Sequence, residues 1–211
     1  MFSSSAYGTN PYANIRESKI VMLGDTQVGK TTLLYALQKN EFNEGIEPTI
    51  GSNVVQIDHQ FDNGQYITLN FYDTAGQERY NSITTFYIQG ASGALICFDP
   101  TIENWHDSVN KWKNIVLDSD PKIFIFAVAT KSDLWIHNND LAMSLFSDVH
   151  KKCNIETVFH VSSLTMDSLG DLKSSLAEKC MEEKHTPTPS VLVLDNSDLQ
   201  QQNQKSACGC F

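Results

Sequence analysis

The stretch KIVMLGDTQVGKT, residues 19–31, decides the fold of this chain. Its apolar first half, residues 19–24, predicts a buried strand that runs directly into the pattern G-x-x-x-x-G-K-[S/T] at residues 24–31. Between a strand and a helix, the two glycines let backbone N–H groups curl around a phosphate, where the helix dipole also favours an anion. We therefore predict a phosphate-binding loop in which Lys30 reaches the β- and γ-phosphates and the Thr31 hydroxyl ligates Mg²⁺. The alternative is a glycine-bounded turn before a helix.

Outward from this loop, short apolar runs alternate with longer amphipathic stretches. We predict strands at residues 19–24, 53–59, 66–72, 93–99, 122–129 and 156–161, and helices at about residues 30–40, 79–90, 102–117, 138–152 and 167–182. The alternation predicts an α/β fold, a mostly parallel six-stranded sheet with helices on both faces. One strand is expected to be antiparallel, because Asn63-Gly64 predicts a tight hairpin turn. One face of the third helix should carry Ile102, Trp105, Val109, Trp112 and Val116.

Composition divides the chain into three parts. Residues 1–17 lack hydrophobic periodicity and predict a flexible N-terminal arm, residues 18–182 predict one domain, and residues 183–211 predict a disordered tail. The net charge of −10 argues against nucleic-acid binding, which needs a basic surface. No apolar run approaches the length of a membrane span. Five cysteines without a C-x-x-C pair indicate a reducing compartment, the cytosol or the cytosolic face of a membrane.

The third predicted strand ends in Asp73-Thr74-Ala75-Gly76-Gln77-Glu78. In an open α/β sheet, ligands bind outside the carboxyl ends of the strands. Asp73 can therefore hold Mg²⁺ through water, Gly76 can offer its N–H to a γ-phosphate, and Gln77 can orient an attacking water. Without the phosphate-binding loop, an ordinary acidic turn would be the better interpretation.

Four motifs in this order, GDTQVGKT (24–31), PTIG (48–51), DTAGQE (73–78) and TKSD (130–133), resemble those of the Ras superfamily of small GTPases. The resemblance covers about residues 18–182, and within it ERYNSIT and YIQGA are similar to segments of Rab proteins. It implies a small G domain of the P-loop NTPase type that binds GTP or GDP with Mg²⁺ and slowly hydrolyses GTP. It also implies a switch in vesicle and membrane traffic. A weakly hydrolysing GTP-binding interaction module, a Rho- or Ras-like signalling GTPase, and an ATP-dependent P-loop enzyme are the alternatives.

The resemblance assigns roles to individual residues. Gln77 would orient the hydrolytic water. Mg²⁺ would be held by Thr31, Thr49 and Asp73. The nucleotide would be contacted by Thr26, Gln27, Val28, Gly29, Lys30, Thr31, Thr32, Phe42, Thr49, Gly76, Thr130, Lys131, Asp133, Ser162, Ser163 and Leu164. Phe42 would pack edge-on to the base, although a buried aromatic at a helix end is an alternative for this residue.

The base-contacting loops depart from the Rab pattern. In the family, the position of Asp133 accepts hydrogen bonds from N1 and N2 of guanine, and the stem of the lysine at position 131 lies along the base. Adenine lacks this pair of donors, so the carboxylate discriminates against ATP. Thr130 stands where Rab and Ras proteins have Asn, and Ser162-Ser163-Leu164 stands where Ser-Ala-Lys is usual. Rho proteins carry similar residues and still bind guanine nucleotides.

The resemblance also implies partners and a lipid anchor. A monomer is expected that binds a GEF, a GAP, a prenylation or GDI-type chaperone, and effectors that read the surface around Val54, Tyr72 and Tyr87. Alternatively, Val54 and Tyr72 only cover the sheet. Cys208-Gly209-Cys210-Phe211 fits either one prenyl group on Cys208 or two prenyl groups on Cys208 and Cys210. Two lipids are favoured, because one chain binds membranes marginally and the tail lacks a polybasic patch. The expected location is the cytoplasm and the cytosolic face of endomembranes.

Overall fold

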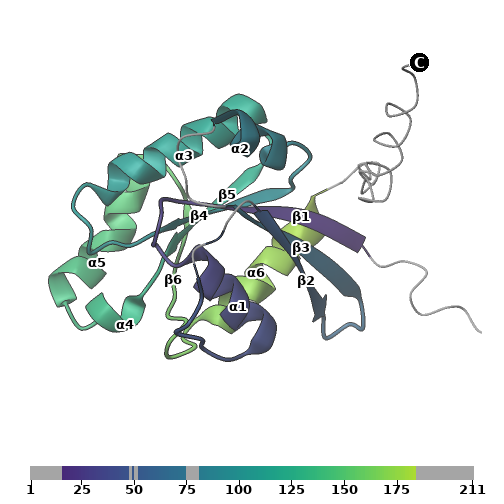
Figure 1. The fold of residues 1–211 in the computed structure, drawn as a ribbon, viewed down its shortest axis with the longest axis horizontal. Coiled ribbons are helices and arrows are strands. Elements are labelled where there is room, and N and C mark those ends of the chain that lie inside the picture. The colour runs from purple at the N-terminus through teal and green to yellow at the C-terminus, as the bar shows by residue number, and fades with distance from the viewer. Residues whose placement is uncertain (1–15, 48, 50–51, 75–80, 184–211) are drawn as a thin grey trace, which may run out of the picture.

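The computed structural model describes residues 16–47, 49, 52–74 and 81–183, and in this part of the chain one mixed sheet runs through the middle (Figure 1). The strand order is β2-β3-β1-β4-β5-β6, and every pair of neighbours is parallel except β2 with β3. The predicted fold class is confirmed. The strands are β1 (Arg16–Leu23), β2 (Ser52–Gln60), β3 (Tyr66–Thr74), β4 (Gly93–Phe98), β5 (Phe124–Ala129) and β6 (Thr157–His160).

Helices cover both faces of the sheet, as the alternating pattern predicts. They are α1 (Lys30–Lys39), α2 (Asn81–Ile88), α3 (Trp105–Ser119), α4 (Ser132–Trp135), α5 (Asn139–Asp148), a π-helical turn η1 (Val149–Cys153) and α6 (Leu169–Glu182). Helices α1 and α6 contribute to one apolar core, whereas α2, α3 and α5 contribute to the other (Figure 1). Strand β1 separates the two cores, because alternate side chains point to opposite faces: Ile20 and Met22 enter the first core, and Val21 and Leu23 enter the second.

The hairpin between β2 and β3 forms where Asn63-Gly64 predicts it. Gly64 has a φ of 81°, and its N–H donates to the carbonyl of Phe61 at 2.9 Å. The side chain of Asn63 accepts a hydrogen bond from the backbone N–H of Gln65 at 3.0 Å. These bonds set the register in which nine residue pairs join the two strands, from Ser52 opposite Thr74 to Gln60 opposite Tyr66.

Four local features differ from the sequence prediction. The predicted helix 138–152 changes its geometry, because α5 ends at Asp148 and the next residues form the π-helical turn η1. The short helix α4 was not predicted. Ile102 was wrongly placed on the apolar face of α3, since it precedes the helix and is 52% exposed. Strand β1 begins at Arg16, inside the range predicted as a flexible arm, because its guanidinium donates to the carbonyl of Met181 at the end of α6 at 2.9 Å.

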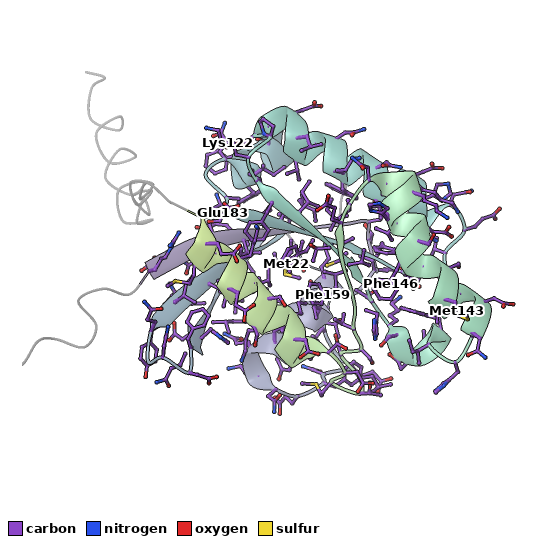
Figure 2. All side chains as sticks on the ribbon, turned by 180° about the vertical axis from the view of Figure 1, so that it is seen from behind. Met22, Lys122, Met143, Phe146, Phe159 and Glu183 are labelled. Carbon is purple, nitrogen blue, oxygen red and sulfur yellow. The ribbon has the colours of Figure 1, made fainter. Side chains whose placement is uncertain are left out.

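Figure 2 shows where apolar side chains lie in this architecture. Met22 lies in the middle of the molecule between the helices, whereas Met143 lies at the outer end of α5, where 82% of it is exposed. Within the described ranges, no helix has both the length and the apolar character needed to cross a bilayer.

Candidate functional site

The carboxyl ends of the parallel strands meet at one edge of the sheet, and two groups of predicted site residues lie there. The first group, called the loop end, consists of residues 24–31 together with Thr49 and Asp73. The second, called the pocket end, consists of Phe42, residues 130–134 and residues 162–164. The structure thus brings together residues that are as much as 140 positions apart in the chain (Gly24 to Leu164).

The loop end is shaped by backbone conformations that glycine adopts readily. Gly24 has a φ of 138°, and a Cβ atom at this position would lie 2.2 Å from the carbonyl oxygen of Cys97. Gly29 has a φ of 98° and forms the N-cap of α1 without a side chain that could accept from the helix N–H groups. Gln27 is also left-handed, with a φ of 65°, although it is not glycine. The amides at the start of α1 are therefore available to an anion.

Lys30 carries the positive charge of the loop end. Its side chain is 5% exposed, and its ammonium group donates to the carbonyls of Gly24 at 2.7 Å and Asp25 at 2.8 Å. Burial lowers the pKa of Lys30, and nearby acidic groups that include Asp73 and Asp25 oppose this change. These two carbonyls hold the ammonium group inside the loop of residues 24–31, where it could pair with a bound phosphate.

Thr31, Thr49 and Asp73 converge beside this lysine, as the sequence predicts for a cation site. The Thr31 hydroxyl donates to Asp73 Oδ2 at 2.7 Å, lies 2.6 Å from the Thr49 hydroxyl, and Thr49 donates to the same carboxylate oxygen at 3.2 Å. Asp73 is fully buried, and its Oδ1 has no hydrogen-bond partner among the described residues. Burial raises the pKa of Asp73, against the hydrogen bonds from both threonines and the charge of Lys30.

An uncompensated buried carboxylate oxygen is costly, and it marks a place for a missing partner. Two hydroxyls and one carboxylate are hard oxygen donors of the type that Mg²⁺ prefers, with the remaining positions left to water and phosphate. The donor set therefore fits a magnesium ion, which Thr31, Thr49 and Asp73 would hold.

The pocket end encloses a cavity of about 250 Å³. Its lining includes the predicted residues Gly29, Thr32, Phe42, Thr130, Lys131, Asp133, Ser163 and Leu164, and three residues that the sequence did not single out, Asn43, Glu44 and Leu134. Phe42 is 39% exposed and faces this cavity, so it is not a buried helix-end residue. Each of the three missed residues lies one or two positions after a predicted site residue in the sequence. This proximity is the signal that could have identified them.

Asp133 is held in place by the loop that follows β6. The buried hydroxyl of Ser162 donates to Asp133 Oδ1 at 2.5 Å, and the same hydroxyl oxygen accepts from the backbone N–H of Thr165 at 3.1 Å. The backbone N–H of Ser132 donates to the carbonyl of Val161 at 3.0 Å, which ties the two loops together. Asp133 therefore presents an oriented carboxylate to the pocket.

Thr130 joins the pocket end to the loop end. Its buried hydroxyl lies 2.6 Å from the carbonyl of Val28 in the phosphate-binding loop and 3.0 Å from the carbonyl of Phe98 at the end of β4. The carbonyl of Thr130 accepts from the indole N–H of Trp135 at 2.8 Å. The departure from the usual Asn thus leaves a side-chain donor that links the two loops.

The predicted effector surface is partly exposed. Val54 is 49% exposed on β2, while Tyr72 on β3 is half-buried and has the ammonium group of Lys19 at 4.5 Å from its ring centroid. Tyr87 packs against the core beneath α2. Val54 is therefore accessible from solvent, whereas Tyr72 is partly covered by Lys19.

Some predicted site residues lie outside the described part of the chain. Gly76 and Gln77 belong to residues 75–80, and Cys208 and Cys210 belong to residues 184–211. Of the loop residues, Thr26 is exposed and Val28 is buried in the first core.

Comparisons with known proteins agree with this geometry. A family model described as "Ras: Ras family" matches residues 19–162, more than half of the chain. The chain is 41% identical to "Ras-related protein RABA1b" from Arabidopsis thaliana over 117 residues, which cover 55% of this chain and 54% of that protein. It is 41% identical to "Ras-related protein YPT3" from Nicotiana plumbaginifolia (55% and 53% covered) and 42% identical to "GTP-binding protein ypt3" from Schizosaccharomyces pombe (55% and 54% covered). The matches span about half the length of these relatives.

Proposed function

Because the chain belongs to the Ras family, we propose that it is a small GTPase of the Rab type and acts as a GTP/GDP-regulated switch in vesicle and membrane traffic. The observation that carries this proposal is the arrangement at the carboxyl edge of the sheet. A phosphate-binding loop with a buried lysine lies next to a pocket that contains an oriented carboxylate. The two are joined by the Thr130 hydroxyl.

The loop end would hold the phosphates. The backbone amides of residues 24–31 and the ammonium group of Lys30 supply donors and positive charge without a change of fold. Thr31, Thr49 and Asp73 would hold Mg²⁺, which neutralises charge on the β- and γ-phosphates. In the GTP state, Thr49 would contact this site, and loss of the γ-phosphate would release its segment, which is how such switches change partners.

The pocket end would hold guanine. The Asp133 carboxylate can accept hydrogen bonds from two N–H groups. Guanine presents two adjacent N–H donors, at N1 and N2, whereas adenine presents no such pair. Ser162 keeps Asp133 oriented in the protein itself, so binding need not order that side chain. Phe42 and Leu164 would contact the faces and edges of the base from the pocket lining.

Hydrolysis would be slow without a partner. Gln77 would orient the attacking water and Gly76 would donate its N–H to the γ-phosphate, roles that rest on the motif DTAGQE alone. Residues 18–77 contain no arginine, so the first switch segment supplies no arginine finger of its own, and a GAP would have to provide one.

A GEF, a GDI-type chaperone and effectors would be the other partners. Prenyl groups on Cys208 and Cys210 would bring the chain to the cytosolic face of endomembranes.

The nucleotide that co-purifies with the full-length chain tests the proposal most directly. We expect chromatography after denaturation to show GDP or GTP, and competition with ATP to leave this nucleotide bound. An adenine nucleotide would instead favour an ATP-dependent P-loop enzyme.

Turnover is tested separately by single-turnover GTP hydrolysis with and without an arginine-supplying GAP. Gln77→Leu should abolish the stimulated rate, and the control Gln65→Leu on the β2–β3 hairpin should not change it. Binding without any hydrolysis in the unaltered chain would favour the weakly hydrolysing interaction module, for which the left-handed Gln27 in the phosphate-binding loop is a reason.

Mass spectrometry of the C-terminal peptide distinguishes one lipid from two, since trimming after Cys208 removes residues 209–211.

A further inference from the structure

Asp99 directly follows β4, and it was not among the residues to which the sequence assigned a role in the site. Its side chain is 5% exposed, and its Oδ2 lies 2.9 Å from the ammonium nitrogen of Lys131, whose side chain is 37% exposed. Its other oxygen, Oδ1, accepts from the backbone N–H of Thr101 at 3.0 Å and from the Thr101 hydroxyl at 2.6 Å. Both carboxylate oxygens of Asp99 therefore have hydrogen-bond donors: Thr101 on Oδ1 and Lys131, which lines the pocket, on Oδ2.

The Asp99 carboxylate is built to stay charged. Burial acts to raise the pKa of Asp99, but the hydrogen bonds from Thr101 and Lys131 outweigh it, so the pKa is lowered overall. An exposed lysine–aspartate pair holds its lysine weakly. Here the carboxylate is buried and rigid, so it provides a fixed point to which the flexible lysine side chain is attached.

Lys131 makes one ion pair among the described residues, the one with Asp99. Its backbone is left-handed, with φ 56° and ψ 40°, at the N-cap of α4, and this conformation sets the direction in which the side chain leaves the chain. A lysine stem has four rotatable carbons and loses considerable entropy when it is confined to one orientation. The ion pair with Asp99 confines it before any ligand arrives, along the wall of the pocket that Lys131 lines.

We propose that Asp99 is a positioning residue for nucleotide binding, which acts by holding the Lys131 side chain along the base pocket. This inference rests on the proposed function, because Lys131 is expected to contact guanine only if the chain binds a guanine nucleotide. Asp99 itself need not touch the nucleotide. Its contribution is to pre-order Lys131, which slows dissociation of the nucleotide.

The test is a double-mutant cycle on the full-length chain, read as the dissociation rate of a fluorescent GDP. Asp99→Asn keeps the shape and removes the charge, and we expect dissociation to become about tenfold faster, the effect of losing one hydrogen bond between charged groups. Lys131→Met should have at least the same effect. The double variant should dissociate no faster than Lys131→Met alone, since Asp99 acts through Lys131.

Asp148→Asn is the matched control, because it removes an aspartate that pairs with Lys152 at 3.3 Å at the end of α5, away from the pocket. It should leave the dissociation rate unchanged. Additive effects of Asp99→Asn and Lys131→Met would overturn the proposal, because they would show that Asp99 acts only through general stability.

Two further measurements keep the test decisive. If Asp99→Asn lowers the melting temperature strongly, Thr101→Ala replaces it; this variant removes one of the two Thr101 bonds to Asp99, and we expect about threefold faster dissociation that again disappears in the Lys131→Met background. No acceleration in either variant would overturn the proposal. Failure of the unaltered chain to bind GDP would instead contradict the proposed function, so the two failures are distinguishable.

Discussion

At the loop end, the backbone sets the geometry: Gly24 and Gly29 adopt left-handed conformations, and the donors that we propose for a phosphate are mainly main-chain amides. At the pocket end, side chains do the work, and each is held by another side chain: Asp133 by Ser162, and Lys131 by Asp99. The two ends therefore tolerate substitutions for different reasons. At a site built from backbone groups, a changed side chain is tolerated unless space or backbone conformation is limiting. At a site built from side chains, a substitution is tolerated when it preserves the hydrogen bond.

The largest effect should come from the charge at the loop end. Lys30→Met removes the buried ammonium group that main-chain carbonyls hold in place, and we expect the affinity for GDP to fall on the order of a thousandfold. The control is Lys39→Met, an exposed lysine at the other end of the same helix, which should change affinity less than about twofold. Titration with fluorescent GDP measures both, and equal losses would contradict the special position of Lys30.

At the pocket end, the predicted effect is on selectivity. Asp133→Ala should reduce the affinity for GDP on the order of a hundredfold and leave the weak binding of ADP unchanged, because only guanine loses two hydrogen-bond acceptors. Competition between GDP and ADP measures the ratio. A ratio that stays the same in the variant would mean that this carboxylate does not read the base.

The link between the two ends can be broken with a single hydroxyl. Thr130→Val keeps the shape and leaves the carbonyl of Val28 without its donor, which should lower the free energy of unfolding by about 1–2 kcal/mol and accelerate GDP dissociation about tenfold. Thr130→Ser retains the hydroxyl and should stay within about threefold of the unaltered chain. Urea unfolding and dissociation kinetics check both, and similar behaviour of the two variants would show that the hydroxyl is unimportant.

A last effect, expected only at alkaline pH, concerns the buried Cys97 next to Gly24 of the loop end. Burial raises the pKa of the Cys97 thiol from its ordinary value of 9.0 to about 12. The unfolded chain therefore loses this proton from about pH 9 while the folded chain keeps it, so stability should fall as the pH rises through this window, by at most about 1.4 kcal/mol per pH unit. Urea unfolding under reducing conditions should show a shallower decline for Cys97→Ala.

Cys180 offers an internal comparison for the same measurement, because burial raises its pKa from 9.0 to about 11. Its contribution should follow the same sign and end about one pH unit earlier. An unchanged slope in both Cys→Ala variants would show that neither thiol is kept neutral by the fold.

Much of the fold was predictable, because it depends on local patterns. The apolar runs, the helix periodicity and the turn at Asn63-Gly64 are properties of neighbouring residues, and the sheet, both helical layers and the hairpin follow from them. The interruption at η1 and the short α4 were missed, since η1 is tied to α3 through bonds from Lys113 to the carbonyl of Cys153 and from Asn110 to the carbonyl of Lys152. Such bonds between distant segments leave no periodic signal.

The sequence alone determined which chemical groups are present at the carboxyl edge of the sheet: a glycine loop with Lys30, oxygen donors at Thr31 and Asp73, and a carboxylate at Asp133. Each lies in the loop or helix start that follows a predicted strand, so its position along the chain already places it near the edge. Only the tertiary structure decided how those groups are held. The attachment of Lys131 to Asp99 and of Thr130 to Val28 joins segments 32 and 102 residues apart, and such contacts depend on packing in three dimensions that no local pattern encodes.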